Sequence, residues 1–191
     1  LLLVSEKGKI LLDFVGKKTR ICLGSKMAIV SSMNNKTPRI NSDGQNLVAY
    51  DNYGKQVWKY DNVSVWSLER TEVAEIGNVL FSINDKPGCG SEGECKWFLI
   101  LIDAEGKELF KSGPYNYIDS LEIAGNGKFG VAYLQKYYTE REIKNDRGYY
   151  LIKNDGGKWK LSKLNDGGFT PVIKGDYIEF NDGNKILLER L

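Results

Sequence analysis

Two kinds of turn signal recur along the chain with one common period, and this periodicity constrains the fold more than any other feature. The first signal is a Gly-Lys pair with a large apolar residue four positions after the glycine, and successive copies are 46, 52 and 51 residues apart. Its glycines are Gly8, Gly54, Gly106 and Gly157. The second signal, a glycine beside a strand-like run, includes Gly24, Gly77, Gly127 and Gly175. Two independent markers with one period predict stacked or radially arranged units.

Each repeat divides into four short runs that have the composition of β-strands. The runs are rich in Val, Ile, Leu, Tyr and Phe and are bounded by Gly, Asn and Asp, which favour turns. The complete units span residues 19–60, 71–112 and 120–164, a partial unit spans 169–191, and residues 1–15 form a further hairpin. We therefore predict an all-β protein, specifically a β-propeller of about four four-stranded blades.

The order of the strands predicts how such a propeller ends. The chain begins with a hairpin of the third-and-fourth-strand type and ends with a first and second strand, so strands from both termini are expected to complete one blade and remove its free edge. The runs LLLVS and KILLERL both resemble the third strand of that blade, however. The alternative is an arc of a larger propeller. In either case residues 1–191 form a single domain, complete or a module of a longer protein.

The clearest hairpin, LVAYDNYGKQVWKY, resembles the blade signature of the PQQ-like (quinoprotein-type) repeat family. The residues that carry the match are Asp51, Gly54, Lys55 and Trp58, and they return as Asp103, Gly106, Lys107 and Phe110. The resemblance implies a propeller fold. Quinoprotein dehydrogenases of that family are larger rings with a calcium-bound quinone, whereas many relatives bind no cofactor and serve as assembly or adhesion scaffolds. No catalytic residue or cofactor is carried over to this chain.

The bulk composition excludes some partners and indicates a compartment. The 27 basic and 25 acidic residues are interspersed, so no polybasic surface for nucleic acid is expected. No apolar run approaches the roughly 20 residues of a membrane helix, and we predict no membrane insertion. Cys89 and Cys95 bracket a short Gly-rich loop and are predicted to form a disulfide, with two free thiols as the alternative. A disulfide would place the domain outside the cytoplasm, whereas Cys22 is expected to be a buried thiol.

The residues of the repeat give little indication of catalysis. The chain contains no histidine, which removes Ser-His-Asp and Cys-His chemistry and the commonest transition-metal ligand. Asp51 and Asp103 are interpreted as residues that stabilise turns, and Trp58 and Phe110 as packing residues between blades. No catalytic residue, metal site or cofactor is therefore assigned. A glycoside hydrolase or lyase that uses two carboxylates in a central pocket remains an alternative.

The long segments between second and third strands are the best candidates for function. They read SMNNKTPRINSDG, NDKPGCGSEGEC and QKYYTEREIKNDRG and are expected to project from one face. Tyr and Arg are favoured at recognition surfaces, so Tyr137, Tyr138, Arg141 and Arg39 are predicted to contact a partner. The sequence thus predicts a non-catalytic module that binds a protein or glycan. A purely structural module of a surface protein is the remaining alternative.

Overall fold

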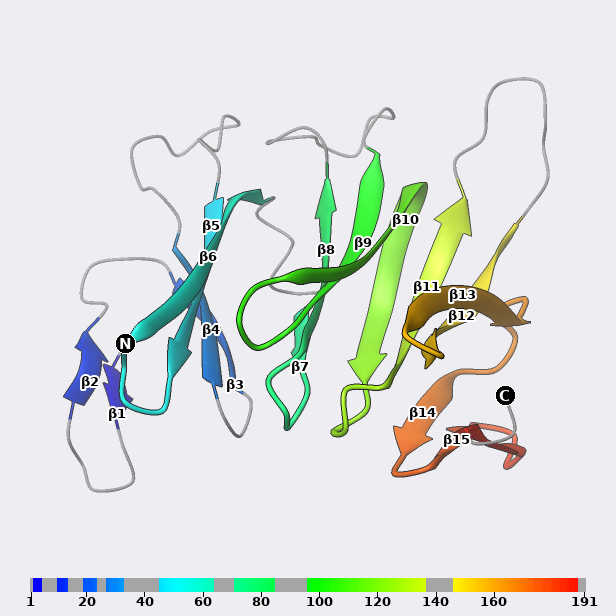
Figure 1. Ribbon diagram of the computed structural model, residues 1–191. Helices are drawn as coiled ribbons and strands as arrows, with labels where there is room; N and C mark the ends of the chain where they lie inside the picture. The colour runs from blue at the N-terminus through cyan, green and yellow to red at the C-terminus, as the bar shows by residue number, and fades with distance from the viewer. Residues whose placement is uncertain are drawn as a thin grey trace.

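The computed structural model in Figure 1 describes residues 2–4, 10–13, 19–23, 27–32, 45–63, 71–84, 96–136 and 146–188. Within these ranges the chain is all-β, with several antiparallel sheets and no helix. The first two sheets are β1(Leu2–Val4)–β2(Ile10–Asp13) and β3(Thr19–Leu23)–β4(Met27–Ser32)–β5(Gln45–Asp51)–β6(Gln56–Val63). The next is β7(Thr71–Val73)–β8(Val79–Asn84)–β9(Trp97–Ile102)–β10(Glu108–Ile123)–β11(Phe129–Lys136)–β12(Arg147–Asp155)–β13(Lys158–Asn165). The last is β14(Pro171–Lys174)–β15(Tyr177–Phe180)–β16(Lys185–Leu187).

The second and third predicted units share one strand. The sequence predicts separate strands at 108–112 and 120–125, but the structure joins them in β10, so both units belong to one seven-stranded sheet. The first part of β10 pairs with β9 and the second part with β11, and Tyr115 pairs with both Trp97 and Lys136. Between the two runs, Tyr115, Tyr117, Ile118 and Asp119 are paired, with shifts in register on either side, so the strand continues through this stretch.

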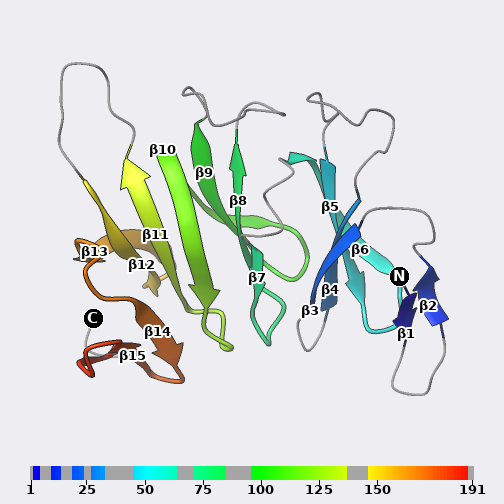
Figure 2. The same cartoon turned by 180° about the vertical axis from the view of Figure 1, so that it is seen from behind.

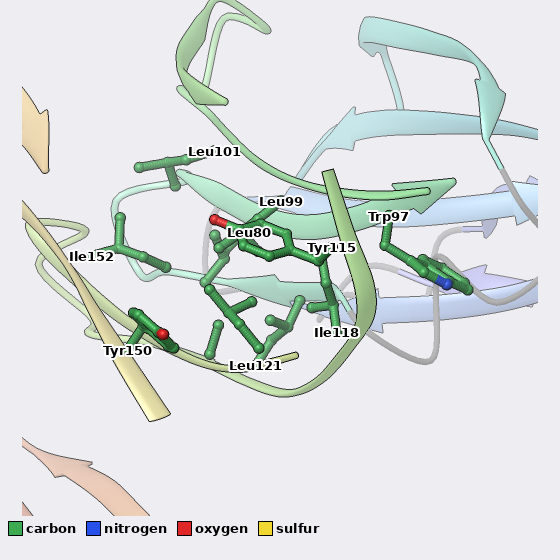
Figure 3. Packing of buried hydrophobic residues seen from close by; sticks show 11 residues of the cluster. Leu80, Trp97, Leu99, Leu101, Tyr115, Ile118, Leu121, Tyr150 and Ile152 are labelled. Atoms are coloured by element: carbon green, nitrogen blue, oxygen red, sulfur yellow. The ribbon is translucent and has the colours of Figure 1, made fainter. Parts of the chain in front are cut away.

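The sheets stand in a row (Figure 1, and from behind Figure 2), and three separate hydrophobic cores lie between successive units from β3 to β16. One core lies between the β3–β6 sheet and the β7–β10 part of the next sheet. A second lies between β7–β10 and β10–β13, and Figure 3 shows its residues. The third joins β11 and β12 to the β14–β16 sheet. At each of these three junctions, neighbouring units pack face to face.

Strand alternation explains why units in the middle of the row are apolar on both faces. Successive side chains of a strand point to opposite faces of its sheet. On β8, Val79 and Phe81 enter the first core, whereas Leu80 enters the second. On β12, Tyr150 enters the second core and Leu151 the third. The near-continuous apolar runs in the sequence thus reflect burial on two sides.

The repeated Asp-x-x-Gly-Lys turns have the same geometry in the two places where the sequence predicts them. The N–H groups of Tyr53 and Lys55 each donate to Oδ1 of Asp51 over 2.9 Å. In the second copy, the N–H groups of Glu105 and Lys107 donate to Oδ1 of Asp103 over 3.1 and 2.8 Å. The interpretation of both aspartates as turn-stabilising residues is confirmed.

Trp58 links this turn to the packing of the row. Its side chain is buried in the first core, and Gly106 of the following unit approaches it so closely that an added Cβ would lie 2.6 Å from the Cβ of Trp58. Gly106 also has a φ of 88°, which disfavours other residues. Phe110 is partly buried against the second core. Both aromatic residues therefore pack between units, as predicted.

We predict that Gly106→Ala destabilises the protein more than Gly157→Ala. Gly157 occupies the same place in its repeat and has a similar φ of 87°, but nothing lies within 4 Å of its Cβ position. Gly157→Ala should cost about 1 kcal/mol of unfolding free energy from backbone strain alone, and Gly106→Ala about 2–4 kcal/mol, because the new methyl group meets Trp58. Chemical denaturation measures both values. Equal losses would show that the contact with Trp58 contributes nothing.

The closure predicted from the sequence is not formed among the described residues. The β1–β2 hairpin and the β14–β16 sheet are separate sheets, and they lie at opposite ends of the row in both views (Figures 1 and 2). The prediction of an all-β fold is confirmed. The sequence predicts either a closed ring or an arc of a larger propeller, and the described strands form an open row with no closed ring.

Candidate functional site

The three long segments of the sequence start and finish at one edge of the row. Strands β4, β8 and β11 end at this edge, and β5, β9 and β12 begin there, at the top of Figure 1. We call it the loop edge. The predicted partner-binding residues Tyr137, Tyr138, Arg141 and Arg39 and the predicted disulfide pair Cys89 and Cys95 all lie outside the described residues. The structure therefore describes the base of the candidate site, and those assignments stay predictions.

Tyr115 connects the bases of two neighbouring segments. It pairs with Trp97, the first residue of β9, and with Lys136, the last residue of β11. Its side chain is buried in the second core, while its hydroxyl is hydrogen-bonded to the hydroxyl of Ser112. Figure 3 shows the ring of Tyr115 in the middle of this core, with Trp97 at one end of it. The base of the loop edge is thus fixed by packing as well as by backbone pairing.

A charged network anchors the third segment where it rejoins the sheet. The hydroxyl of Tyr150 donates to Oδ1 of Asp146 over 2.8 Å, and Nζ of Lys163 lies 3.0 Å from the same oxygen. Nζ of Lys163 also lies 2.6 Å from Oδ1 of Asp166. Asp146 is the first described residue after the segment, so these bonds tie the segment's end to β12 and β13.

The ionisation of this network reflects its partial burial. The pKa of Tyr150 is raised to about 12, first because its phenol is removed from water and then because it donates to the Asp146 carboxylate. The hydrogen bonds to Asp166 and Asp146 hold the pKa of Lys163 above its ordinary value. The phenol therefore stays neutral and the ammonium stays charged at physiological pH. This arrangement fixes the end of the segment against β12 and β13.

We predict that Tyr150→Phe lowers the free energy of unfolding by about 1–2 kcal/mol, because a hydrogen bond to a carboxylate is lost while Lys163 still pairs with Asp146. Alkaline titration followed by tyrosine absorbance should also lose one group that ionises at about pH 12. The matched control is Tyr117→Phe, since Tyr117 is exposed and its bond to Asp119 is 3.3 Å long. Indistinguishable results for the two variants would contradict the anchoring role.

A second feature of chemical interest was not recognised in the sequence. Glu72 on β7 and Glu122 on β10 stand at equivalent positions, each in the first strand of its unit and opposite Leu80 and Val131, respectively. Strand β10 contacts both β7 and β14. Oε2 of Glu122 accepts a 3.0 Å hydrogen bond from the backbone N–H of Ile173. This carboxylate therefore joins the seven-stranded sheet to the last sheet.

Both glutamates hold their protons more tightly than a free carboxyl group does. The pKa of Glu72 is raised by desolvation and by the charge of Glu122. The pKa of Glu122 is raised by desolvation, against the opposing effects of the Ile173 hydrogen bond and the charge of Lys174. The signal in the sequence was the recurrence of Glu with the repeat period, inside TEVAEIG and SLEIAG. Only packing shows that these positions are neighbours.

We predict that stability falls as pH rises through the ionisation of this pair. The folded-state pKa values of both glutamates lie above the unfolded-state value, so the folded protein binds these protons more tightly. The resulting stabilisation is fully present at low pH and is lost as the pH rises through the folded-state pKa values. Glu122→Gln should flatten this slope at pH values above the ordinary glutamate pKa of about 4.3, and it keeps the acceptor for Ile173. Urea unfolding at several pH values measures the slope.

Glu122→Ala is the matched variant of that experiment. It also removes the charge, but it leaves the Ile173 N–H without its acceptor, so it should be less stable than Glu122→Gln by about 1 kcal/mol. A slope that is the same in the wild type and in both variants would show that the Glu72–Glu122 pair does not govern the pH dependence.

The remaining comparisons and searches add few constraints. In the part of the chain that the structure describes, no three Cys, Asp or Glu side chains come together as metal ligands would, and no helix has the length and apolar character needed to cross a bilayer. A scan against protein-family models found no match, and a search of curated proteins found no significant match.

Proposed function

We propose that this protein is a non-catalytic binding or assembly module that presents the segments of its loop edge to a protein or glycan partner. The supporting observation is that the flanking strands of all three long segments meet at this one edge. The segments span 12 residues between β4 and β5, 12 between β8 and β9, and 10 between β11 and β12, whereas only 4 residues join β15 to β16. Long connections concentrated at one edge of a regular scaffold are typical of binding surfaces.

The fixed base of the loop edge supports this proposal. Tyr115 is buried between the strands that carry two of the segments, and Tyr150 and Lys163 hold Asp146 at the end of one of them. A rigid base lowers the conformational cost of ordering a binding segment, which favours affinity. Tyr150 and Tyr115 are themselves buried, so partner contacts are assigned to the segments.

The architecture is proposed to be of the propeller type, as an arc whose four-stranded units pack face to face. Three observations support it: the sequence period, the identical turns at Asp51 and Asp103, and the three cores between successive units. The resemblance to PQQ-like repeats points in the same direction and is compatible with a scaffold that has no cofactor. The proposed compartment is extracytoplasmic, because Cys89 and Cys95 are spaced for a disulfide.

The test removes the predicted contact residues together. Tyr137→Ala, Tyr138→Ala and Arg141→Ala in one variant should weaken binding by roughly tenfold or more, because Tyr and Arg hot-spot residues commonly contribute about 2 kcal/mol each. Binding is measured on a glycan array and by photo-crosslinking of the tagged domain on the surface of its source cells. Thermal unfolding is measured on the same variant, and an unchanged midpoint would show that the lost binding does not come from unfolding.

Tyr53→Ala is the control for that experiment. Tyr53 is 87% exposed, but it lies in the β5–β6 turn, at the edge opposite the loop edge. Loss of binding in this variant to the same extent, or full binding by the triple variant, would contradict the proposed surface. A wild-type domain that captures no partner in either assay would favour a purely structural module.

The second candidate is a carboxylate-based glycoside hydrolase or lyase, and the Glu72–Glu122 pair is the observation that favours it. Such enzymes use two carboxyl groups, one of which is kept protonated by a raised pKa. The two candidates differ in which variants lose function. Turnover of chromogenic glycosides that disappears in Glu72→Gln and in Glu122→Gln, but not in the triple loop variant, would establish the hydrolase.

A further inference from the structure

Among the described residues, the last sheet has one strand fewer than the four-stranded units. Four strands make up β3–β6, and four make up each half of the seven-stranded sheet when β10 is counted in both halves. The β14–β16 sheet has three, in the order β14-β15-β16. No described residue pairs with the outer side of β16, so this strand is an open edge in the described part of the chain.

The hydrogen-bond register shows which groups this edge presents. Phe180 donates its N–H to the carbonyl of Asn184, and Leu188 donates to the carbonyl of Asp176. Antiparallel pairs alternate between bonded and non-bonded, so Ile186 bonds inward to Ile178. The N–H and C=O groups of Lys185 and Leu187 therefore point outward. These groups are the template that an added strand would use.

The opposite edge of the same sheet is already occupied. By the same alternation the N–H of Ile173 points away from β15, and it donates to Glu122 of the neighbouring sheet over 3.0 Å. The two edges therefore differ: β14 is satisfied by a specific acceptor, whereas β16 is not. On β16 itself Leu187 is 43% exposed, and Val172 on β14 is 40% exposed.

The other end of the row holds the complementary element. Strands β1 and β2 form a two-stranded sheet that pairs with no other described strand. By its sequence, β2 corresponds to the fourth strand of a repeat unit, as β6 does in the first unit. It follows Gly8-Lys9, and its Leu12 occupies the position that Trp58 has in β6. A fourth strand is the type missing from the β14–β16 sheet. An isolated hairpin is also marginally stable in water, so pairing would stabilise both partners.

We propose that the β1–β2 hairpin of a second copy of this chain pairs along the open edge of β16. The two elements lie at opposite ends of the row, so pairing within one chain would require the sheets to repack around their three cores. The hairpin of a second copy can pair with the open edge of β16 without any repacking of the sheets. The contact is head-to-tail, and it leaves a free β16 edge and a free hairpin on the pair for further copies.

Sedimentation of the 191-residue chain over a wide concentration range tests the proposal. The wild type should form a concentration-dependent series of oligomers. Leu187→Pro removes an outward donor without touching the inward ladder, and should weaken association about tenfold or more. Leu187→Ala keeps that N–H and should still associate, whereas Ile186→Pro should disrupt the sheet itself. A wild type that stays monomeric, or a Leu187→Pro variant that associates normally, overturns the proposal.

Crosslinking of mixed isotopes decides the question even if the proline variant fails to fold. Equal amounts of unlabelled and ¹⁵N-labelled wild-type chain are mixed and treated with a lysine-reactive crosslinker. Lys185 lies in β16, and Lys9 immediately precedes β2. Lys185–Lys9 crosslinks between light and heavy peptides are expected. Crosslinks confined to peptides of the same isotope would show closure within one chain, and the absence of any would show no pairing; either result overturns the proposal.

Discussion

Burial of both faces of successive sheets is the constraint on which the rest of the structure depends. A sheet with apolar side chains on both faces is stable only when a neighbour covers each of them. Leu80 and Phe81 are adjacent in β8 and fully buried, yet they belong to different cores. Each core therefore stabilises two units at once. The stability of one unit is coupled mainly to that of its neighbours, as in other repeat proteins.

The conspicuous residues of the repeat serve this packing. Asp51 and Asp103 hold their turns through backbone hydrogen bonds, and the second of these turns brings Gly106 against Trp58. The glycine has two roles, since it permits a left-handed backbone and leaves space for the indole ring. The motif is therefore explained by the geometry of the scaffold, and it does not by itself point to a reaction.

The distinctive chemistry lies where the units differ. At the loop edge, Asp146 is bonded by both Tyr150 and Lys163. Between the seven-stranded sheet and the last sheet, Glu122 accepts the N–H of Ile173 instead of leaving that edge open. Polar groups at these borders decide which edges are satisfied and which are available for a partner. The function is accordingly proposed at the borders of the repeat and at its open edge.

Local chemistry was sufficient to derive the strands, the turns and the packing role of Trp58. Alternation and turn residues act over a few positions, so they can be read from one sequence. The merging of two predicted strands into β10 was not foreseen, because residues 113–119 acquire their pairing only when β9 and β11 lie on either side. Tyr137, Tyr138, Arg141 and Arg39 were inferred from residue type and from their place in the long segments, and the described residues do not include them.

The sequence by itself determined that the chain is all-β, that its units repeat, and that Asp51 and Asp103 stabilise turns. Only the tertiary structure decided that Glu72 and Glu122 come close enough to influence each other, and that the terminal sheets lie apart. The physical reason is the range of the interactions. Turn and strand preferences are local, whereas desolvation, charge coupling and the pairing of sheet edges depend on residues far apart in the chain.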